Sequence, residues 1–236
     1  FHNISEAPMG GDRVITTPEF FAYIKIAEGC DNCCTYCVIP SLRGKFRSRR
    51  MSDIVNEAKD LAALGVKELC VIAQDTTRYG EDIYGTSCLD SLLRELSTID
   101  GIEWIRVLYM YPDRITDALI DEIANNPKIV KYFDIPVQHV TDRMLSAMNR
   151  RDTAASIRST VERIRAKIPD AVLRTTFITG FPGETEEDYK AMGDFIDEMK
   201  FDRLGVFEYS REEGTKAYDM PDQIPHFIDK VAHSLI

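Results

Sequence analysis

The sequence lacks the marks of a membrane protein, a secreted protein or a dinucleotide-binding sheet. Its 236 residues contain no run of about 18 apolar residues, so no membrane-spanning helix is predicted. The first residues, FHNISEAPMGGDR, include neither a basic nor an apolar segment, so no signal peptide is predicted. No G-x-G-x-x-G motif follows the first β-rich run, which disfavours a dinucleotide site. A cytoplasmic protein without membrane contact is expected.

Positive charge and cysteine are also scarce. The formal net charge is −10, with 29 Lys and Arg against 39 Asp and Glu. A large nucleic-acid surface usually needs a basic excess, so direct nucleic-acid binding by this domain is not expected. The six cysteines do not resemble a secreted disulfide framework, because four of them lie within eight residues. The chain begins with Phe1 rather than Met, which indicates a fragment of a longer protein.

A repeated alternation of β-rich and helical segments is present along the chain. Several β-rich runs are apolar almost throughout, as strands buried on both faces are. The helical patterns between them carry start signals, such as a capping box at Thr185 and Asp188. Six such units predict an α/β fold, a partial or complete TIM-like βα barrel with parallel strands. The expected strands are residues 22–28, 68–74, 104–110, 132–138, 173–180 and 203–209.

The predicted barrel indicates where chemistry should take place. We expect one barrel domain at residues 20–236, preceded by a linker or N-terminal extension at residues 1–19. Active sites of such barrels lie at the carboxyl ends of the strands. Cys30 opens a cysteine cluster two residues after the first expected strand. The cluster therefore stands where an active site is expected.

The four crowded cysteines, at positions 30, 33, 34 and 37, suit three kinds of site. Disulfide bonds are disfavoured, because thiols this close cannot form two unstrained bridges. Zinc suits the residue type, although structural zinc sites usually separate their two halves by about a dozen residues. The third interpretation is a 4Fe–4S cluster bound by a C-x3-C-x2-C motif that leaves Cys33 out. Three cysteines leave one iron open, as in a catalytic metal site.

The C-x3-C-x2-C spacing, with Tyr36 before its last cysteine, resembles the signature of radical S-adenosylmethionine (SAM) enzymes. Six further blocks make the resemblance narrower, because together they are similar to the methylthiotransferases, and most of all to the RimO type, which modifies a ribosomal protein. The resemblance runs from about residue 20 to residue 218. The blocks are IAEGCDNCCTYCVIPSLRGKFRSR, AQDTTRYG (73–80), YMYPDRIT (109–116), YFDIPVQH (132–139), MLSAMNR (144–150), RTTFITGFPGETEEDY (174–189) and EYSREEGTKAY (208–218).

The resemblance implies which residues bind the cofactors. The 4Fe–4S cluster would be held by Cys30, Cys34 and Cys37. Tyr36 is expected beside the adenine of SAM, and Arg174 at its carboxylate, which a guanidinium binds through paired hydrogen bonds. The other SAM contacts are expected at strand ends, at Gln74, Asp75 and Gln138. A structural hydrogen bond at the barrel mouth is the alternative for each of these side chains, and no general acid or base is assigned.

A basic run follows the cysteines and consists of Arg43, Lys45, Arg47, Arg49 and Arg50. It would give the barrel mouth a substrate-facing basic patch that attracts an acidic peptide or a phosphate backbone, unless it is a solvated surface without specific function. GFPGE, residues 180–184, predicts a tight turn that either approaches the ligand or simply joins a strand to a helix. His139 is given no catalytic role. Cys33 departs from the family pattern and would compete for iron during cluster assembly.

The resemblance also implies a reaction and its partners. It predicts that a methylthio group is added to the β-carbon of an aspartate in the twelfth small-subunit ribosomal protein, with reductive cleavage of SAM at the cluster. A second SAM would supply the methyl group, and a second 4Fe–4S cluster the sulfur. That cluster belongs to an N-terminal domain, which is expected to be absent here, like the C-terminal substrate-recognition domain. A flavodoxin-like or chemical electron donor is expected.

Two other functions stay open from the sequence. One is a tRNA methylthiotransferase that acts on a modified adenosine. The motifs SLRGKFRSR, AQDTTRYG and DIPVQH and the acidic balance fit the ribosomal protein type better. The other is a non-catalytic iron–sulfur or zinc protein that binds a partner, which anaerobic iron loading and a metal assay would distinguish.

Overall fold

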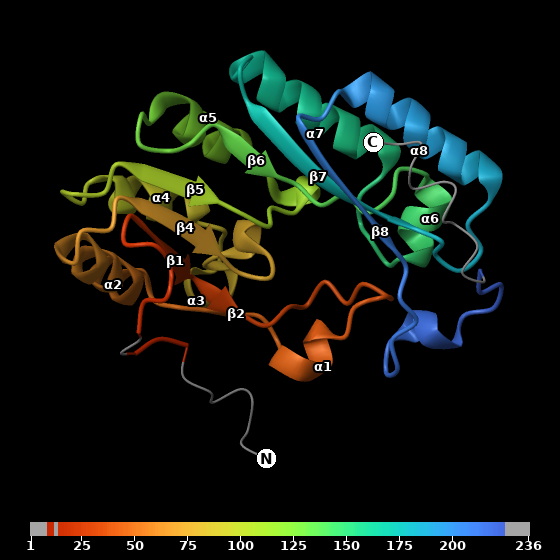
Figure 1. Cartoon of the computed structure of the whole chain (residues 1–236), viewed down its shortest axis with the longest axis horizontal. Helices are drawn as coiled ribbons and strands as arrows, with labels where there is room; N and C mark the ends of the chain where they lie inside the picture. The colour runs from red at the N-terminus through yellow and green to blue at the C-terminus, as the bar shows by residue number, and fades with distance from the viewer. Residues whose placement is uncertain (1–8, 12–13, 225–236) are drawn as a thin grey trace.

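All six β-rich runs form strands, and their pairing bends them into an arc (Figure 1). The structure is a computed structural model that describes residues 9–11 and 14–224. The strands are β1 (Phe21–Lys25), β4 (Glu68–Ile72), β5 (Trp104–Val107), β6 (Tyr132–Asp134), β7 (Val172–Thr179) and β8 (Arg203–Glu208). They pair in parallel as β1–β4–β5 and β6–β7–β8, so the predicted parallel α/β fold is confirmed.

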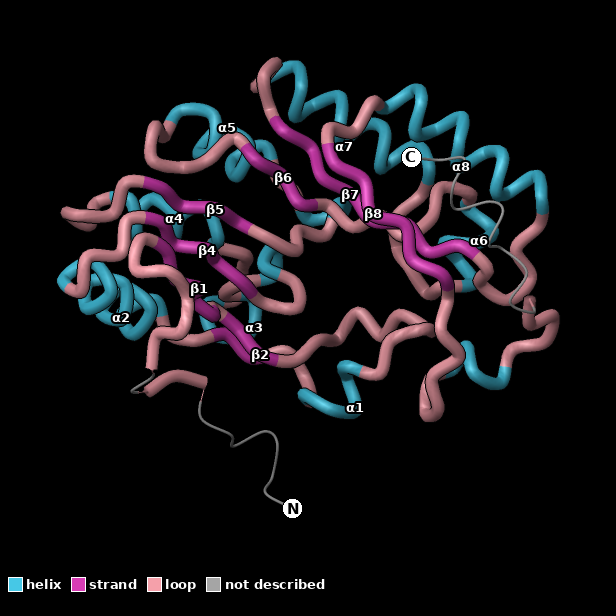
Figure 2. The backbone as a smooth tube through the Cα atoms, viewed as in Figure 1, coloured by secondary structure: helices cyan, strands magenta, loops and turns pink. Residues whose placement is uncertain are grey.

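The two groups of strands continue one another between β5 and β6. Ile105 forms a parallel bridge with Ile129, and the Met110 N–H donates to the Asp134 carbonyl at 2.9 Å. Figure 2 shows the resulting arc, with β1 at one end and β8 at the other. Within residues 14–224, β1 and β8 do not pair with each other. The fold is therefore a partial βα barrel.

The first expected strand is interrupted before the cysteines. β1 ends at Lys25, and a short strand β2 (Ala27–Glu28) pairs antiparallel with β3 (Arg47–Ser48). The Ile26 N–H still donates to the Ile72 carbonyl at 3.0 Å, so the chain follows β4 up to this residue. The β2–β3 ribbon then holds together the two ends of the segment that contains the cysteines.

Helices cover the outer side of the arc (Figure 1). The longer ones are α2 (Met51–Ala63), α4 (Leu89–Ser97), α5 (Asp117–Asn125), α7 (Ala154–Lys167) and α8 (Glu186–Met199). The capping box predicted for α8 is present, because Thr185 accepts the Asp188 N–H and Asp188 accepts the Thr185 N–H. The shorter elements are α1 (Ile39–Arg43), α3 (Glu81–Tyr84), α6 (Asp142–Ala147) and the 3₁₀ helices η2 (Thr76–Arg78), η3 (Pro112–Arg114) and η4 (Lys216–Asp219).

Alternation along β7 separates the core under the helices from the inner face of the arc. Leu173 and Phe177 are buried, whereas Arg174 and Thr176 line a cavity on the other side. Burying each such apolar side chain contributes about 1.5–3 kcal/mol. No helix in the described part of the chain has the length and apolar character needed to cross a membrane. Residues 1–8, 12–13 and 225–236 lie outside the described residues, so the domain boundary at residue 20 stays a prediction.

Candidate functional site

The cysteine loop, residues 30–37, leaves the β2–β3 ribbon at Gly29. This glycine has φ +78°, and a β-carbon there would collide with the Lys45 carbonyl oxygen. The Cys30 N–H donates to the Gly44 carbonyl at 3.1 Å, which fixes the first cysteine to the chain that returns after α1. A side chain at position 29 would push these two segments apart.

The same loop is fixed to the second half of the arc. The Thr35 N–H donates to the Met148 carbonyl at 3.0 Å, and its hydroxyl donates to the Ala147 carbonyl at 2.9 Å. The Thr35 carbonyl accepts the Ala217 N–H at 2.9 Å. The Asn149 side-chain amide donates to the Cys33 carbonyl at 2.9 Å. The loop therefore connects the end of α6, near one end of the arc, with β2 at the other.

The four cysteines of the loop differ in exposure. Cys30, Cys34 and Cys37 are partly buried, whereas Cys33 is exposed and has a left-handed backbone with φ 54°. The pKa of the Cys30 thiol is raised to about 11, mainly by burial and also by the charges of Asp75, Cys34 and Cys37, while the Asn32 N–H opposes the rise. The charges of Cys34 and Cys37 act on Cys30, and those of Cys34 and Cys33 act on Cys37, so the four thiols lie close together and Cys33 is the most exposed of them.

The arrangement fits a cube of iron and sulfide better than a single ion. In the part of the chain that the structure describes, no three His, Cys, Asp or Glu side chains meet around one metal position. In a 4Fe–4S cube each cysteine binds a different iron, so its three thiolates stand apart around the cluster. Cys30 and Cys34 line one cavity, whereas Cys37, Cys70 and Cys88 are not part of its lining. A cube bound here by three cysteines keeps one iron for another ligand.

That cavity has a volume of about 390 Å³ and collects most of the predicted SAM contacts. Its lining comes from the cysteine loop, the strand ends and the inner face of β7. The predicted residues in it are Cys30, Cys34, Tyr36, Gln74, Gln138 and Arg174. A larger hollow of about 690 Å³ beside Glu57 and Ile83 contains none of these six residues.

Two glutamines of the lining have buried oxygens without a partner. Gln74 Oε1 and Gln138 Oε1 find no hydrogen-bond donor among the described residues. Gln138 also has a left-handed backbone, with φ 70°. A buried acceptor left unpaired costs about 1–3 kcal/mol, so a ligand with N–H groups would find two acceptors ready. The amine of SAM is such a donor.

Arg174 is less free than the sequence alone suggested. Its Nη1 lies 2.6 Å from Asp134 Oδ1, and this hydrogen bond raises the pKa of the guanidinium. Asp134 is 1% exposed and also accepts the Tyr109 N–H at 3.1 Å. A guanidinium has five N–H donors, so the side chain keeps donors for a carboxylate in the cavity.

Arg150 is a cavity residue that the sequence did not single out. It is buried, stacks over the Tyr111 ring at 4.1 Å and pairs with Asp152 at 3.1 Å. Its Nε has no hydrogen-bond partner among the described residues. Burial raises the pKa of Tyr36 well above its usual value, the Cys34 thiol raises it further, and Arg150 opposes both. The only sequence signal was the MLSAMNR block that ends at Arg150.

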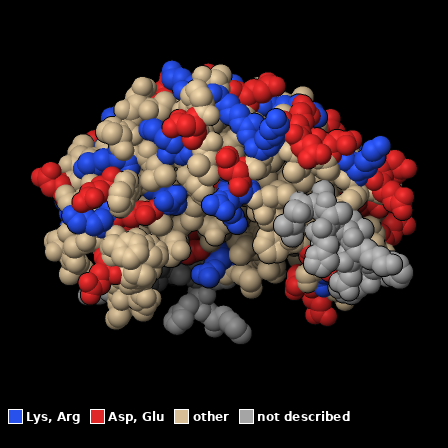
Figure 3. Space-filling model, turned by 45° about the horizontal axis from the view of Figure 1, so that its top comes forward, with Lys and Arg blue, Asp and Glu red and all other residues tan. Residues whose placement is uncertain are grey.

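Asp75 and all five residues of the basic run lie outside the lining of this cavity. Asp75 is 1% exposed, does not line the cavity, and has its pKa raised by burial. Arg49 is buried and lies 2.6 Å from Glu57, so it does not belong to an exposed patch. Arg47 is partly buried, which leaves Arg43, Lys45 and Arg50 exposed. On the face drawn in Figure 3, basic and acidic side chains are interspersed.

His139 and the GFPGE turn belong together. His139 is fully buried, and its Nδ1 accepts the N–H groups of Val140 at 2.8 Å and Thr141 at 3.2 Å. Nε2 therefore carries the hydrogen and donates to Glu184 Oε1 at 3.0 Å. Glu184 Oε2 in turn accepts the Gly180 N–H. The turn after β7 is thus tied to the end of β6, and His139 has no place in the cavity.

Comparison with known proteins gives the family. Residues 24–196 match the model of the Radical SAM superfamily, a span that includes the cysteine loop, both glutamines and Arg174. The chain belongs to the radical SAM superfamily.

Curated relatives are similar along almost the whole chain. The chain is 55% identical over 226 residues to the ribosomal protein uS12 methylthiotransferase RimO of Acetivibrio thermocellus, which is 95% of this chain and 50% of that protein. The chain is 57% identical over 212 residues to the RimO of Geobacter sulfurreducens, and the match covers 90% of this chain and 47% of that protein. The chain therefore spans about half the length of the curated relatives it matches.

Solved structures share the fold at low identity. The radical SAM methyltransferase TsrM from Kitasatospora setae, with cobalamin and a [4Fe–4S] cluster bound, has a TM-score of 0.66 and 19% identity, over 80% of this chain and 34% of its own. The coproporphyrinogen III oxidase HemN from Escherichia coli has a TM-score of 0.61 and 20% identity, and the match covers 87% of this chain and 48% of HemN. The partial barrel is thus the fold of radical SAM enzymes.

Proposed function

We propose that this chain is the SAM-binding core of an enzyme that adds a methylthio group to ribosomal protein uS12. The observation that carries the proposal is the identity of about 55% to proteins named as uS12 methylthiotransferases, over 90% or more of this chain. The cavity supports it, because the thiols of Cys30 and Cys34, two unpartnered glutamine oxygens and the Arg174 guanidinium line it.

The residues of the cavity have distinct parts in this proposal. Cys30, Cys34 and Cys37 would hold a 4Fe–4S cluster, which with SAM supplies a carbon radical able to remove hydrogen from an unactivated carbon. Gln74 and Gln138 would accept hydrogen bonds from the amine of SAM, and Arg174 would bind its carboxylate. The aromatic rings of Tyr36 and Tyr109 would exclude water from the cavity.

The further partners belong to the same proposal. The substrate would be the uS12 aspartate whose β-hydrogen is exchanged for a methylthio group, and an external donor would supply the electron. The sulfur source would be a second cluster bound by a domain outside this chain. Exposed basic residues of the patch, Arg43 and Lys45 among them, would attract acidic groups of the substrate peptide.

The test separates SAM cleavage from sulfur transfer. Loaded anaerobically with iron and sulfide and given a strong reductant, this chain should convert SAM to methionine and 5′-deoxyadenosine, and should leave a uS12 peptide unmodified. A full-length relative should give the peptide the mass of a methylthio group in place of one hydrogen. Modification of tRNA instead would show that the substrate is wrong, and absence of SAM cleavage would overturn the proposal.

A further inference from the structure

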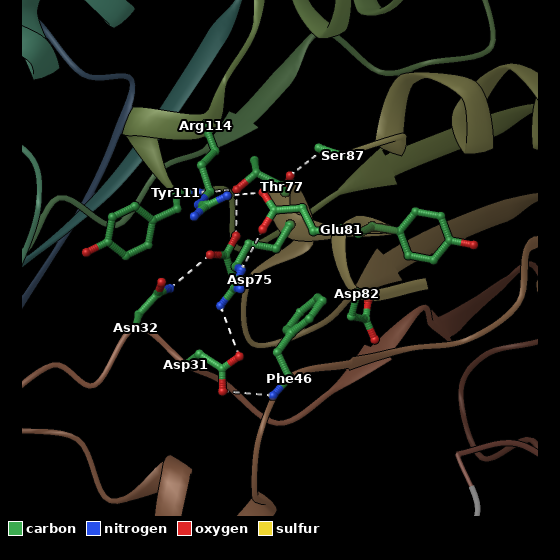
Figure 4. Close-up of polar contacts among 12 residues, drawn as sticks. Asp31, Asn32, Phe46, Asp75, Thr77, Glu81, Asp82, Ser87, Tyr111 and Arg114 are labelled. Atoms are coloured by element: carbon green, nitrogen blue, oxygen red, sulfur yellow. Dashed lines mark hydrogen bonds and ion pairs between the residues drawn. The ribbon is translucent and has the colours of Figure 1, made fainter. Parts of the chain in front are cut away.

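The cysteine loop is held on one side by the turn that follows β4 (Figure 4). Asn32 stands between Cys30 and Cys33, and its side-chain amide donates to Asp75 Oδ2 at 2.9 Å. The neighbouring Asp31 accepts the Phe46 N–H at 3.2 Å and lies 3.4 Å from an Arg78 nitrogen. Two consecutive loop residues are thus bound by the segment of residues 75–78.

Asp75 uses both carboxylate oxygens within the protein. Oδ1 accepts the Thr77 hydroxyl at 2.5 Å, and the Thr77 oxygen accepts the Tyr111 N–H at 3.2 Å. The carboxyl group is 1% exposed, and the ion pairs near it are made by Glu81 with Arg78 and Arg114. Burial raises the pKa of this carboxyl group, and its hydrogen bonds from Thr77 and Asn32 and the charges of Arg114 and Arg78 oppose that effect.

Asn32 connects this turn with the opposite half of the arc and with a cysteine. Its Oδ1 accepts a hydrogen bond from Arg151 Nη2 at 2.9 Å, and Arg151 Nε lies 3.2 Å from Asp113. Its backbone N–H points at Cys30 Sγ, 3.5 Å away. Hydrogen bonds to ligand sulfurs and charges near a cluster are among the factors that set its reduction potential.

We propose that Asp75 and Asn32 form a positioning pair, which fixes Cys30 in the cysteine loop and places a buried negative charge behind the cluster, and that Asp75 does not contact SAM. The part of the inference that concerns the cluster rests on the proposed function. The part that concerns Cys30 does not depend on it, because the hydrogen bonds of the pair should hold Cys30 in place in the iron-free chain too.

Two variants separate position from charge. Asn32→Ala removes the bond to Asp75. Iodoacetamide then alkylates Cys30 in the iron-free chain, and fragment-ion mass spectrometry locates the product. The rate should become about tenfold faster, which corresponds to the lower end of the free energy of a hydrogen bond to a charged group. The matched control is Asn126→Ala, which removes an amide bound to Ser97 and Glu122 far from the loop in sequence, and should leave this rate unchanged.

Asp75→Asn keeps the shape, because its amide oxygen can still accept from Asn32 and its NH₂ can donate to Thr77. The loss of its charge should increase the thiolate fraction of Cys30, so alkylation rates are compared per thiolate over a range of pH and should then stay near those of the unaltered chain. After loading, one electron from dithionite should enter the cluster more readily, since a negative charge is gone. A tenfold change in the reduced-to-oxidised ratio corresponds to about 59 mV in a titration followed by electron paramagnetic resonance.

The outcomes distinguish the inference from the proposed function. If the unaltered chain binds no iron and sulfide, the proposed function fails, and the alkylation rates still decide whether the pair holds Cys30. If Asn32→Ala leaves those rates unchanged, the positioning pair is wrong. If Asp75→Asn weakens SAM binding without moving the potential, Asp75 contacts SAM and the inference is overturned.

Discussion

Two dipeptides at strand ends, Gln74–Asp75 after β4 and Gln138–His139 after β6, divide their roles in the same way. In each, the glutamine lines the cavity with a buried oxygen that has no partner among the described residues. In each, the next residue is buried and bound inside the protein. Asp75 has an extended backbone, in which successive side chains point to opposite sides, whereas Gln138 has a left-handed backbone, so the two strand ends reach the same division through different local geometry.

The second residues of the two dipeptides bind different parts of the molecule. Asp75 binds Asn32, 43 positions away in the cysteine loop, and brings a negative charge close to Cys30. His139 binds Glu184, 45 positions away in the turn before α8. A change at Asp75 should therefore reach the cluster, whereas a change at His139 should reach only the stability of the barrel. A strand-end position by itself does not identify a SAM contact.

The largest effect is expected at the cysteines. The iron content of their variants is the reference for changes in either dipeptide. Cys34→Ala should abolish iron binding, because Cys34 lines the cavity, whereas Cys33→Ala should retain most of it, because Cys33 is exposed. Iron and sulfide are measured after anaerobic loading of both variants. Equal iron contents would show that the assignment of the three ligands is wrong.

A change at Arg174 tests whether a side chain that is paired with Asp134 can also bind SAM in the cavity. Arg174→Lys keeps a charge beside Asp134 but loses the planar fork, so SAM binding to the loaded chain should weaken by about 1.5–3 kcal/mol. Calorimetric titration measures the change. Arg106→Lys is the control, because Arg106 lies 2.7 Å from Glu68 and does not line the cavity. Unchanged SAM affinity in Arg174→Lys would leave Arg174 a purely structural role.

His139→Ala should lower the stability of the chain without changing how much iron it binds. The change leaves Glu184 Oε1 and the N–H groups of Val140 and Thr141 without their His139 partner, so the free energy of unfolding should fall by about 1–3 kcal/mol or more. Iron content after loading should remain that of the unaltered chain. Urea denaturation of the iron-free chain and an iron assay measure the two quantities, and iron loss here would contradict the division of roles.

The glutamines should give the smallest change in stability. Gln74→Leu and Gln138→Leu each remove an unpaired buried oxygen, so the free energy of unfolding should stay equal or rise by up to about 1 kcal/mol, while SAM binding weakens. Gln223→Leu is the control, because its amide donates to the carbonyls of Ala217 and Met220 and its loss should destabilise the chain. Clear destabilisation by Gln138→Leu would mean that its oxygen is bound within the protein.

Local patterns were enough to predict the strands, the parallel barrel, the α8 capping box and the cysteine loop. Each depends on residues close in sequence: apolar runs, a Thr185–Asp188 pair, and cysteines at fixed spacing. The strand ends were placed too late, since after β4 and β6 the chain turns to bring one side chain into the cavity and the next into the protein. Sequence periodicity continues through such a turn without marking it.

Only the tertiary structure decided which polar residues face the cavity. Gln74 and Asp75 are equivalent in the sequence, and their separation depends on Asn32, which folding brings to one of them. Arg49 belongs to the basic run in the sequence, but Glu57, in the second turn of α2, binds it inside the protein. Arg150 enters the cavity because α6 ends beside the cysteine loop. The sequence determines which chemical groups are present, and long-range contacts determine which of them remain unpaired for a ligand, because a buried polar group binds whichever partner the fold places within reach.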